Sequence, residues 1–147
     1  MKLRALGFGV ALLLSLGCAS PPLATEPIDW DDADEAWSIL VVTTEPDGGD
    51  RVTRIWLAME GEEAVLRTGD SSWWANLQRN PRIRVRHDDI EYPFAFRQVT
   101  DADEKVRIDE VFLTKYGGWE RMLFPQERGE THENYGRLLP VAAGSGY

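Results

Sequence analysis

The chain is poor in the residues on which disulfide, thiol and metal chemistry depend. It has one cysteine, Cys18, and two histidines, His87 and His132, among 147 residues. A single cysteine leaves no disulfide framework. Zinc and iron sites gather several His, Cys or carboxylate ligands, so we expect no metal. A Ser-His-Asp mechanism lacks a placed base, which leaves hydrolytic catalysis without support.

Positive charge and long apolar runs are also scarce. The chain has 16 Lys and Arg against 25 Asp and Glu, for a net charge of −9. Without a basic surplus to displace counterions from phosphates, nucleic acid is not an expected partner. The apolar run near the start falls short of the ~20 residues that a spanning helix needs. The length suits one domain with a real core.

The run before Cys18 is basic at its start, then apolar, and contains no acidic residue. This order is typical of a secretory signal peptide. Because it ends at a cysteine, it resembles the bacterial lipoprotein signal, although that family favours Leu where this chain has Ser15. The resemblance implies lipid on Cys18 and attachment to a membrane. Since Ala19 follows, Gram-negative sorting would place the protein at the periplasmic face of the outer membrane. The alternatives are an ordinary signal peptide, or a membrane anchor, with an unrelated thiol.

Composition divides the chain into four segments. Residues 1–17 form the predicted signal peptide, and 18–35, rich in Pro, small residues and acids, form a flexible tether. Residues 36–142 form the folded domain, and 143–147 a short tail.

The folded part alternates strands and short helices. We expect an opening antiparallel meander with strands at 37–44, 51–58 and 64–68. Ser71 or Ser72 caps a short helix that stops before Asn80-Pro81. A later helix from about Thr100 should stop at residues 117–118. Further expected elements are a short helix at 119–124, a polar loop at 126–133 and a final strand at 135–141.

Two amphipathic patterns predict which side chains are buried. If Asp88-Asp89 is a two-residue turn, Arg86 faces Glu91 and Ile83 faces Phe94 across a hairpin. One hairpin face is then core: Ile83, Val85, Ile90, Tyr92, Phe94 and Phe96. The other is solvated or faces a ligand: Arg82, Arg84, Arg86, Glu91 and Arg97. The expected buried face of the later helix is Ala102, Val106, Phe112, Leu113 and Tyr116. Together these elements indicate an α+β fold with a barrel-like sheet.

The densest motif is a Trp-x-x-Asn-Leu-x-x-Asn-Pro run that leads into a basic strand. Its residues are Trp73, Asn76, Leu77, Asn80 and Pro81. The run resembles the flavin- and deazaflavin-binding split-barrel proteins, relatives of pyridoxamine phosphate oxidase and of the deazaflavin-dependent nitroreductases. The resemblance implies an antiparallel split β-barrel with flanking helices. It also leaves room for a homodimer, since such barrels often build their site across two subunits.

The same resemblance implies an oxidoreductase that binds FMN or a deazaflavin. Carried over, Arg67 and Thr68 would contact a cofactor phosphate, with Ser72 and the helix amides behind them, which is chemically reasonable for an anion. The full set of expected cofactor-binding residues is Arg51, Thr53, Arg67, Thr68, Ser72, Trp73 and Asn76.

Two departures from the family favour a second interpretation. Residues 45–50 are acidic where deazaflavin nitroreductases place a basic loop, and Trp73 stands where flavin-binding members often have Lys. Export would also separate the chain from a cofactor made inside the cell. The alternative is a non-catalytic lipoprotein whose barrel has lost the cofactor and binds a small ligand or a protein partner.

Overall fold

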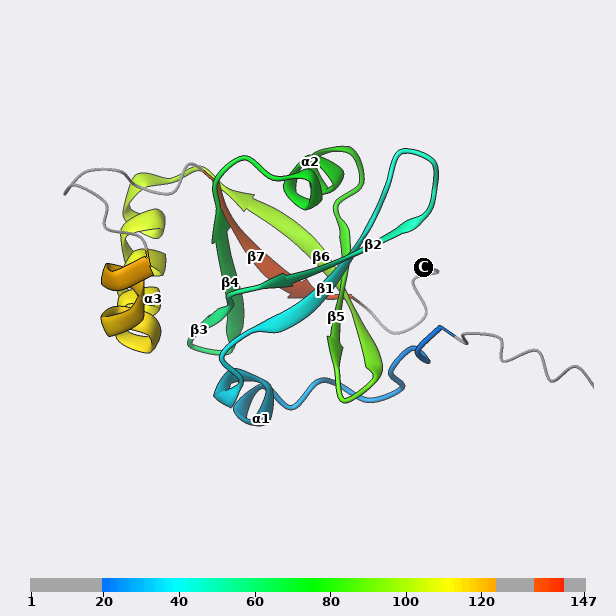
Figure 1. Ribbon diagram of the computed structural model, residues 1–147, viewed down its shortest axis with the longest axis horizontal. Coiled ribbons are helices and arrows are strands. Elements are labelled where there is room, and N and C mark those ends of the chain that lie inside the picture. Colours follow the sequence, from blue (N-terminus) through cyan, green and yellow to red (C-terminus); the bar gives the residue numbers. More distant parts are fainter. Residues whose placement is uncertain (1–19, 124–133, 142–147) are drawn as a thin grey trace, which may run out of the picture.

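One curled antiparallel sheet forms the body of the protein, with helices at its margins (Figure 1). The computed structural model describes residues 20–123 and 134–141. Cys18, the predicted signal peptide, the loop at 126–133 and the tail at 143–147 therefore lie outside the described residues. Within them the strand order is β2-β1-β5-β6-β7-β4-β3. The strands are β1 (Ile39–Thr44), β2 (Asp50–Ile55), β3 (Ala58–Glu60), β4 (Glu63–Thr68), β5 (Arg82–His87), β6 (Ile90–Val99) and β7 (Asn134–Pro140).

The predicted strand at 51–58 is two strands on opposite edges of the sheet. β2 ends at Ile55 and pairs with β1, whereas β3 begins at Ala58 and pairs with β4. The expected continuous meander is therefore wrong. The alternation fails where Ile55, Leu57 and Ala58 are all buried, because the chain crosses the molecule there. The crossing carries Trp56 between the two hairpins.

The β5–β6 hairpin has the predicted register. Arg86 faces Glu91 and Ile83 faces Phe94. Asp88 and Asp89 both have positive φ, 49° and 58°, as a two-residue turn of this hand requires.

The hairpin face expected to be solvated is only partly so. Glu91 is 2 % exposed, because Arg84 and Arg86 donate to its carboxylate and the chain at 22–24 covers it. The Glu91 amide donates to the Pro22 carbonyl (2.9 Å), and the Ala24 amide donates to the Glu91 carbonyl (2.8 Å).

The described part of the predicted tether is folded, which corrects the flexible assignment for those residues. Helix α1 (Trp30–Glu35) begins at the N-cap Asp29, whose side chain accepts from the amides of the first turn. Ile28 and Ala33 are buried, and the Trp30 ring lies 5.4 Å from the Phe94 ring. The N-terminal segment thus closes one end of the barrel (Figure 1).

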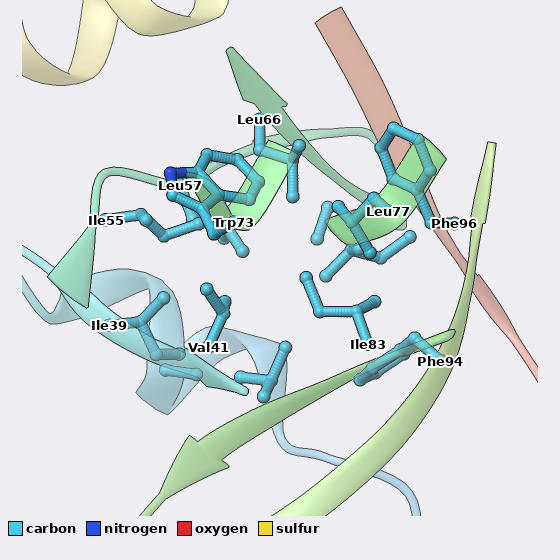
Figure 2. Close-up of a cluster of buried hydrophobic side chains, with 14 of the residues drawn as sticks. Ile39, Val41, Ile55, Leu57, Leu66, Trp73, Leu77, Ile83, Phe94 and Phe96 are labelled. Carbon is cyan, nitrogen blue, oxygen red and sulfur yellow. The ribbon is translucent and has the colours of Figure 1, made fainter. Parts of the chain in front are cut away.

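Helix α2 (Ser72–Arg79) lies at the other end of the barrel (Figure 1). Ser71 is its N-cap, as predicted, and its side chain accepts from the Trp74 amide. Between the two ends lies the main core, in which Trp73 and Leu77 meet strand residues such as Leu66 and Ile83 (Figure 2).

Helix α3 (Ala102–Leu123) packs outside the sheet and continues through the expected stop at 117–118. The separate helix predicted at 119–124 is therefore wrong. The buried residues Ile108, Phe112 and Tyr116 recur every four positions and join a second core with Val65 and Tyr135. A helical glycine costs about 1 kcal/mol, which this packing can offset.

The expected buried face of α3 is wrong in part. Phe112 and Tyr116 are buried, whereas Ala102 is exposed, Val106 is 56 % exposed and Leu113 is 45 % exposed. Among the described residues, no helix combines the length and apolar character needed to cross a membrane.

Candidate functional site

A pocket of about 520 Å³ lies between the barrel and α3, and we call it the aromatic pocket. Its size falls within the range of small-molecule sites. Five of its ten lining residues are aromatic or aliphatic, and the others include two arginines and two hydroxyl-bearing residues. The lining residues are Trp37, Ser38, Arg54, Ile55, Trp56, Arg67, Thr68, Gly69, Trp73 and Phe112.

Trp37 and Trp56 form one aromatic wall of the pocket, and Tyr116 packs behind them. Trp56 stacks on Tyr116 with centroids 4.6 Å apart and planes at 11°. Trp37 meets both rings edge-on, at 5.9 Å and 5.1 Å. Trp37 is nevertheless 45 % exposed, so it presents apolar ring surface to whatever enters.

Tyr116 fixes this wall from behind. Its hydroxyl donates to the Leu57 carbonyl at 2.8 Å and accepts from the Leu57 amide at 3.3 Å. Burial raises the pKa of Tyr116 to about 12, so the ring is neutral at physiological pH. The chain crossing at Trp56 and Leu57 is thereby tied to α3.

Arg67 is buried in the pocket and held from two sides. Its side chain is 6 % exposed, and its guanidinium carbon lies 4.4 Å from the Phe112 ring centroid. Its Nη1 donates to Asp109 Oδ1 at 2.5 Å. The Tyr135 hydroxyl also lies 3.0 Å and 3.1 Å from the two Asp109 oxygens. An Asp109 carboxylate therefore offsets the charge of Arg67.

Arg54 is the second cation of the pocket, and its surroundings differ. It lies on β2, is exposed, and donates to Ser38 Oγ at 3.2 Å. Within residues 20–123 and 134–141, no carboxylate forms an ion pair with it. Its charge is available to an anionic ligand.

A comparison with known protein families assigns the chain to one of them. Residues 30–133 match a family described as "Uncharacterized protein conserved in bacteria (DUF2255)". The chain belongs to this DUF2255 family. No curated protein matches it.

Solved structures of the same architecture confirm the split-barrel fold. A conserved hypothetical protein from Mycobacterium tuberculosis is 22 % identical, with a TM-score of 0.57 and 77 % of each chain covered. A protein described as an F420-H2 dependent reductase is 16 % identical, with a TM-score of 0.54 and coverage of 69 % of this chain and 93 % of that one. The heme storage protein HutZ from Vibrio cholerae is 12 % identical, with a TM-score of 0.56 and coverage of 77 % and 87 %.

Three of the predicted site residues of this DUF2255 chain meet in the pocket: Arg67, Thr68 and Trp73. Arg51 and Thr53 are not among the lining residues. Arg51 forms an ion pair with Glu45 and, three residues from Arg54, points to the other face of β2.

Two predicted residues on α2 also lie outside the pocket lining. Ser72 is exposed, and the neighbouring Ser71 caps the helix instead. Asn76 is 1 % exposed, and its Nδ2 donates to Thr43 Oγ1 at 3.1 Å, which ties α2 to β1. This buried structural contact explains the presence of Asn76 in the motif, and no ligand is needed to explain it.

The sequence prediction missed the other seven lining residues: Trp37, Ser38, Arg54, Ile55, Trp56, Gly69 and Phe112. Arg51 and Arg54 lie three residues apart and therefore on opposite faces of β2. Only the pairing of β2 in the sheet shows which of the two faces the pocket. The broken alternation around Trp56 was the one available signal for the crossing.

Outside the pocket, two acidic features stand near α1. A hollow of about 640 Å³ is lined by Trp30, Asp31, Asp34, Glu35, Met59, Gly61 and Glu62. Separately, Asp32, His87 and Asp88 bring ligand atoms within 4.8 Å of one another, with His87 Nε2 2.7 Å from Asp32 Oδ2. The hydrogen bond and the exposure of both carboxylates account for this group as a surface contact.

Proposed function

We propose that this protein binds a flavin-type cofactor, FMN or a deazaflavin, in the aromatic pocket and acts as an oxidoreductase. The observation that carries the proposal is the combination of an exposed Trp wall with arginine side chains in one pocket of this fold. The names of two structural neighbours, an F420-H2 dependent reductase and a FAD-binding protein, support it.

The lining residues fit such a group. Trp37 and Trp56 offer ring surface to a planar heterocycle, and Arg54 with Ser38 offers donors to an anionic substituent. When bound, the cofactor would supply the redox chemistry. The titratable side chains among the lining residues are arginines, so the pocket's work is to bind, orient and exclude water.

Other structural neighbours are heme proteins. The side chains that line the pocket help to decide between heme and a flavin-type cofactor. Heme iron takes an axial His, Cys, Met or Tyr. The described lining offers none of these side chains. This favours a flavin-type group over heme.

The test is a binding titration of the full chain with FMN and with a deazaflavin, followed by visible absorbance and thermal melting. We expect a shifted cofactor spectrum and a raised Tm. Trp37→Leu should weaken binding, whereas Trp30→Leu, at the acidic hollow, should not. A protein that changes neither cofactor's spectrum nor its own Tm would contradict the proposal.

A specific observation supports the second candidate, a non-catalytic binding protein. Asp109 offsets Arg67, and Glu45 pairs with Arg51, so less positive charge reaches a cofactor phosphate than the residue types suggest. Under this alternative, bound flavin stays oxidised when a nicotinamide donor is added without oxygen. Bleaching of the flavin under those conditions supports the oxidoreductase.

The location of the protein is also a proposal, and it rests on the sequence before and at Cys18. We propose export, lipid attachment at Cys18 and anchoring at the outer membrane. Expression in a Gram-negative host with an alkyne-tagged fatty acid should label the wild type. Cys18→Ser should lose the label and leave the membrane fraction; labelling that survives the substitution would refute this assignment.

We further propose a homodimer. One structural neighbour is described as a domain-swapped dimer. Light scattering coupled to size exclusion measures the mass in solution, and a monomer at all concentrations would contradict the proposal.

A further inference from the structure

We infer that Arg54, and not Arg67, supplies the charge that recognises an anionic ligand in the aromatic pocket. Asp109 offsets the charge of Arg67 and holds its side chain in position. The ligand class follows: a planar aromatic molecule with one anionic group near Arg54. The inference deepens the proposed function and rests on it for the flavin identity alone. It assigns separate roles to two arginines that share one pocket.

The first step is the charge balance at Arg67. Its Nη1 lies 2.5 Å from Asp109 Oδ1, and its side chain is 6 % exposed. An ion pair this short, with its arginine this buried, leaves little net field for a ligand.

The second step is the rigidity of that pair. Asp109 and Phe112 lie three residues apart on α3, so they share a face and hold Arg67 between them. Tyr135, which faces Arg67 across the β4–β7 ladder, contacts both Asp109 oxygens. Asp109 is therefore a positioning residue for Arg67.

The third step is the contrast at Arg54. Its side chain is exposed at the pocket, and its one described polar contact is the neutral Ser38 hydroxyl. A ligand anion can reach this guanidinium without displacing a carboxylate. Charge-assisted hydrogen bonds of this kind are about twice as strong as neutral ones.

The experiment compares ligands that differ only in an anionic group. FMN and riboflavin form one pair, and anilinonaphthalene sulfonate and its uncharged parent N-phenylnaphthylamine form the second. The Kd of each is measured by fluorescence on the full chain, for the wild type and for Arg54→Gln, Asp109→Asn and Arg51→Gln. Arg51→Gln is the matched control, since it removes an arginine from the same strand but outside the pocket.

We expect the wild type to prefer the anionic member of each pair by about tenfold or more. Arg54→Gln should reduce that preference to near unity and leave the affinity for the neutral member almost unchanged. Asp109→Asn should raise the preference, because it removes one carboxylate that offsets the charge of Arg67. Arg51→Gln should leave the ratio as in the wild type.

The outcomes separate this inference from the proposed function. If the naphthalene pair behaves as expected and neither flavin binds, the flavin assignment fails and the roles of the arginines stand. A preference that survives Arg54→Gln, or a fall in preference on Asp109→Asn, overturns the inference. Failure of the wild type to bind any of the four ligands overturns both.

Discussion

The arginines of the aromatic pocket and Arg137 of strand β7 show two opposite uses of the same side chain. Arg137 is surrounded by Glu60, Glu63 and Glu104, and its side chain is 6 % exposed. Arg54 is exposed and has no carboxylate partner among the described residues. In a chain with a net charge of −9, an arginine without an acidic partner is the informative one.

The difference indicates where structure ends and binding begins. The carboxylates around Arg137 come from β3, β4 and α3, so this cluster fastens the outer helix to the sheet. Nothing in the fold requires the charge of Arg54. We therefore expect substitutions in the cluster to change stability, and substitutions at Arg54 to change ligand affinity.

The largest effect should come from Arg137→Gln. The substitution removes the cation that three carboxylates share in a partly buried cluster. We expect it to lower the free energy of unfolding by about 3 kcal/mol. Arg54→Gln should cost less than about 0.5 kcal/mol. Urea unfolding of both variants measures this contrast, and equal destabilisation would remove it.

Acid should weaken the same cluster selectively. Hydrogen bonds from Arg97 and then Arg137 lower the pKa of Glu104 from 4.5 to about 2. Because the folded pKa is depressed, this stabilisation is present above the unfolded pKa and is lost as pH falls from 4.5 towards 2. Its size is about 2 kcal/mol after allowance for solvent screening.

The check is the free energy of unfolding as a function of pH for the wild type and for Glu104→Gln. We expect the two curves to converge as the pH falls through that interval. Parallel curves would show that Glu104 does not titrate as its contacts require.

A smaller effect is expected behind the pocket wall. Tyr116→Phe removes the hydroxyl that pairs with both polar groups of the Leu57 backbone. The cost should be about 1–2 kcal/mol, since Leu57 is buried. Thermal melting gives this value, and ligand affinity should also fall because the hydroxyl holds in place the ring on which Trp56 stacks. An unchanged Tm would mean that water satisfies Leu57 in the variant.

The features that could be predicted from the sequence are those that depend on residues close together in the chain. The β5–β6 register could be predicted because the turn and the alternation of Ile83 and Val85 are local. The split-barrel fold could be predicted from the Trp73–Pro81 motif. The crossing at Trp56 could not, because it depends on which edge of the sheet β3 joins.

The site was harder to predict for the same reason. Arg67, Thr68 and Trp73 come from one continuous segment and were found together. Trp37, in the loop between α1 and β1, Arg54 on β2 and Phe112 on α3 reach the pocket from three separate segments. Nothing in the sequence around Asp109 indicates a role in the pocket, because that role depends on its ion pair with Arg67, which is distant in sequence.

The most direct test of the account is an NMR titration that follows the indole N–H signals of the tryptophans as FMN is added to the full chain. Single Trp→Phe variants assign the signals. We predict that those of Trp37 and Trp56 shift with FMN concentration, while that of Trp30, at the acidic hollow, stays in place. A shift at Trp30 alone, or at none of the three, would contradict a cofactor site in the aromatic pocket.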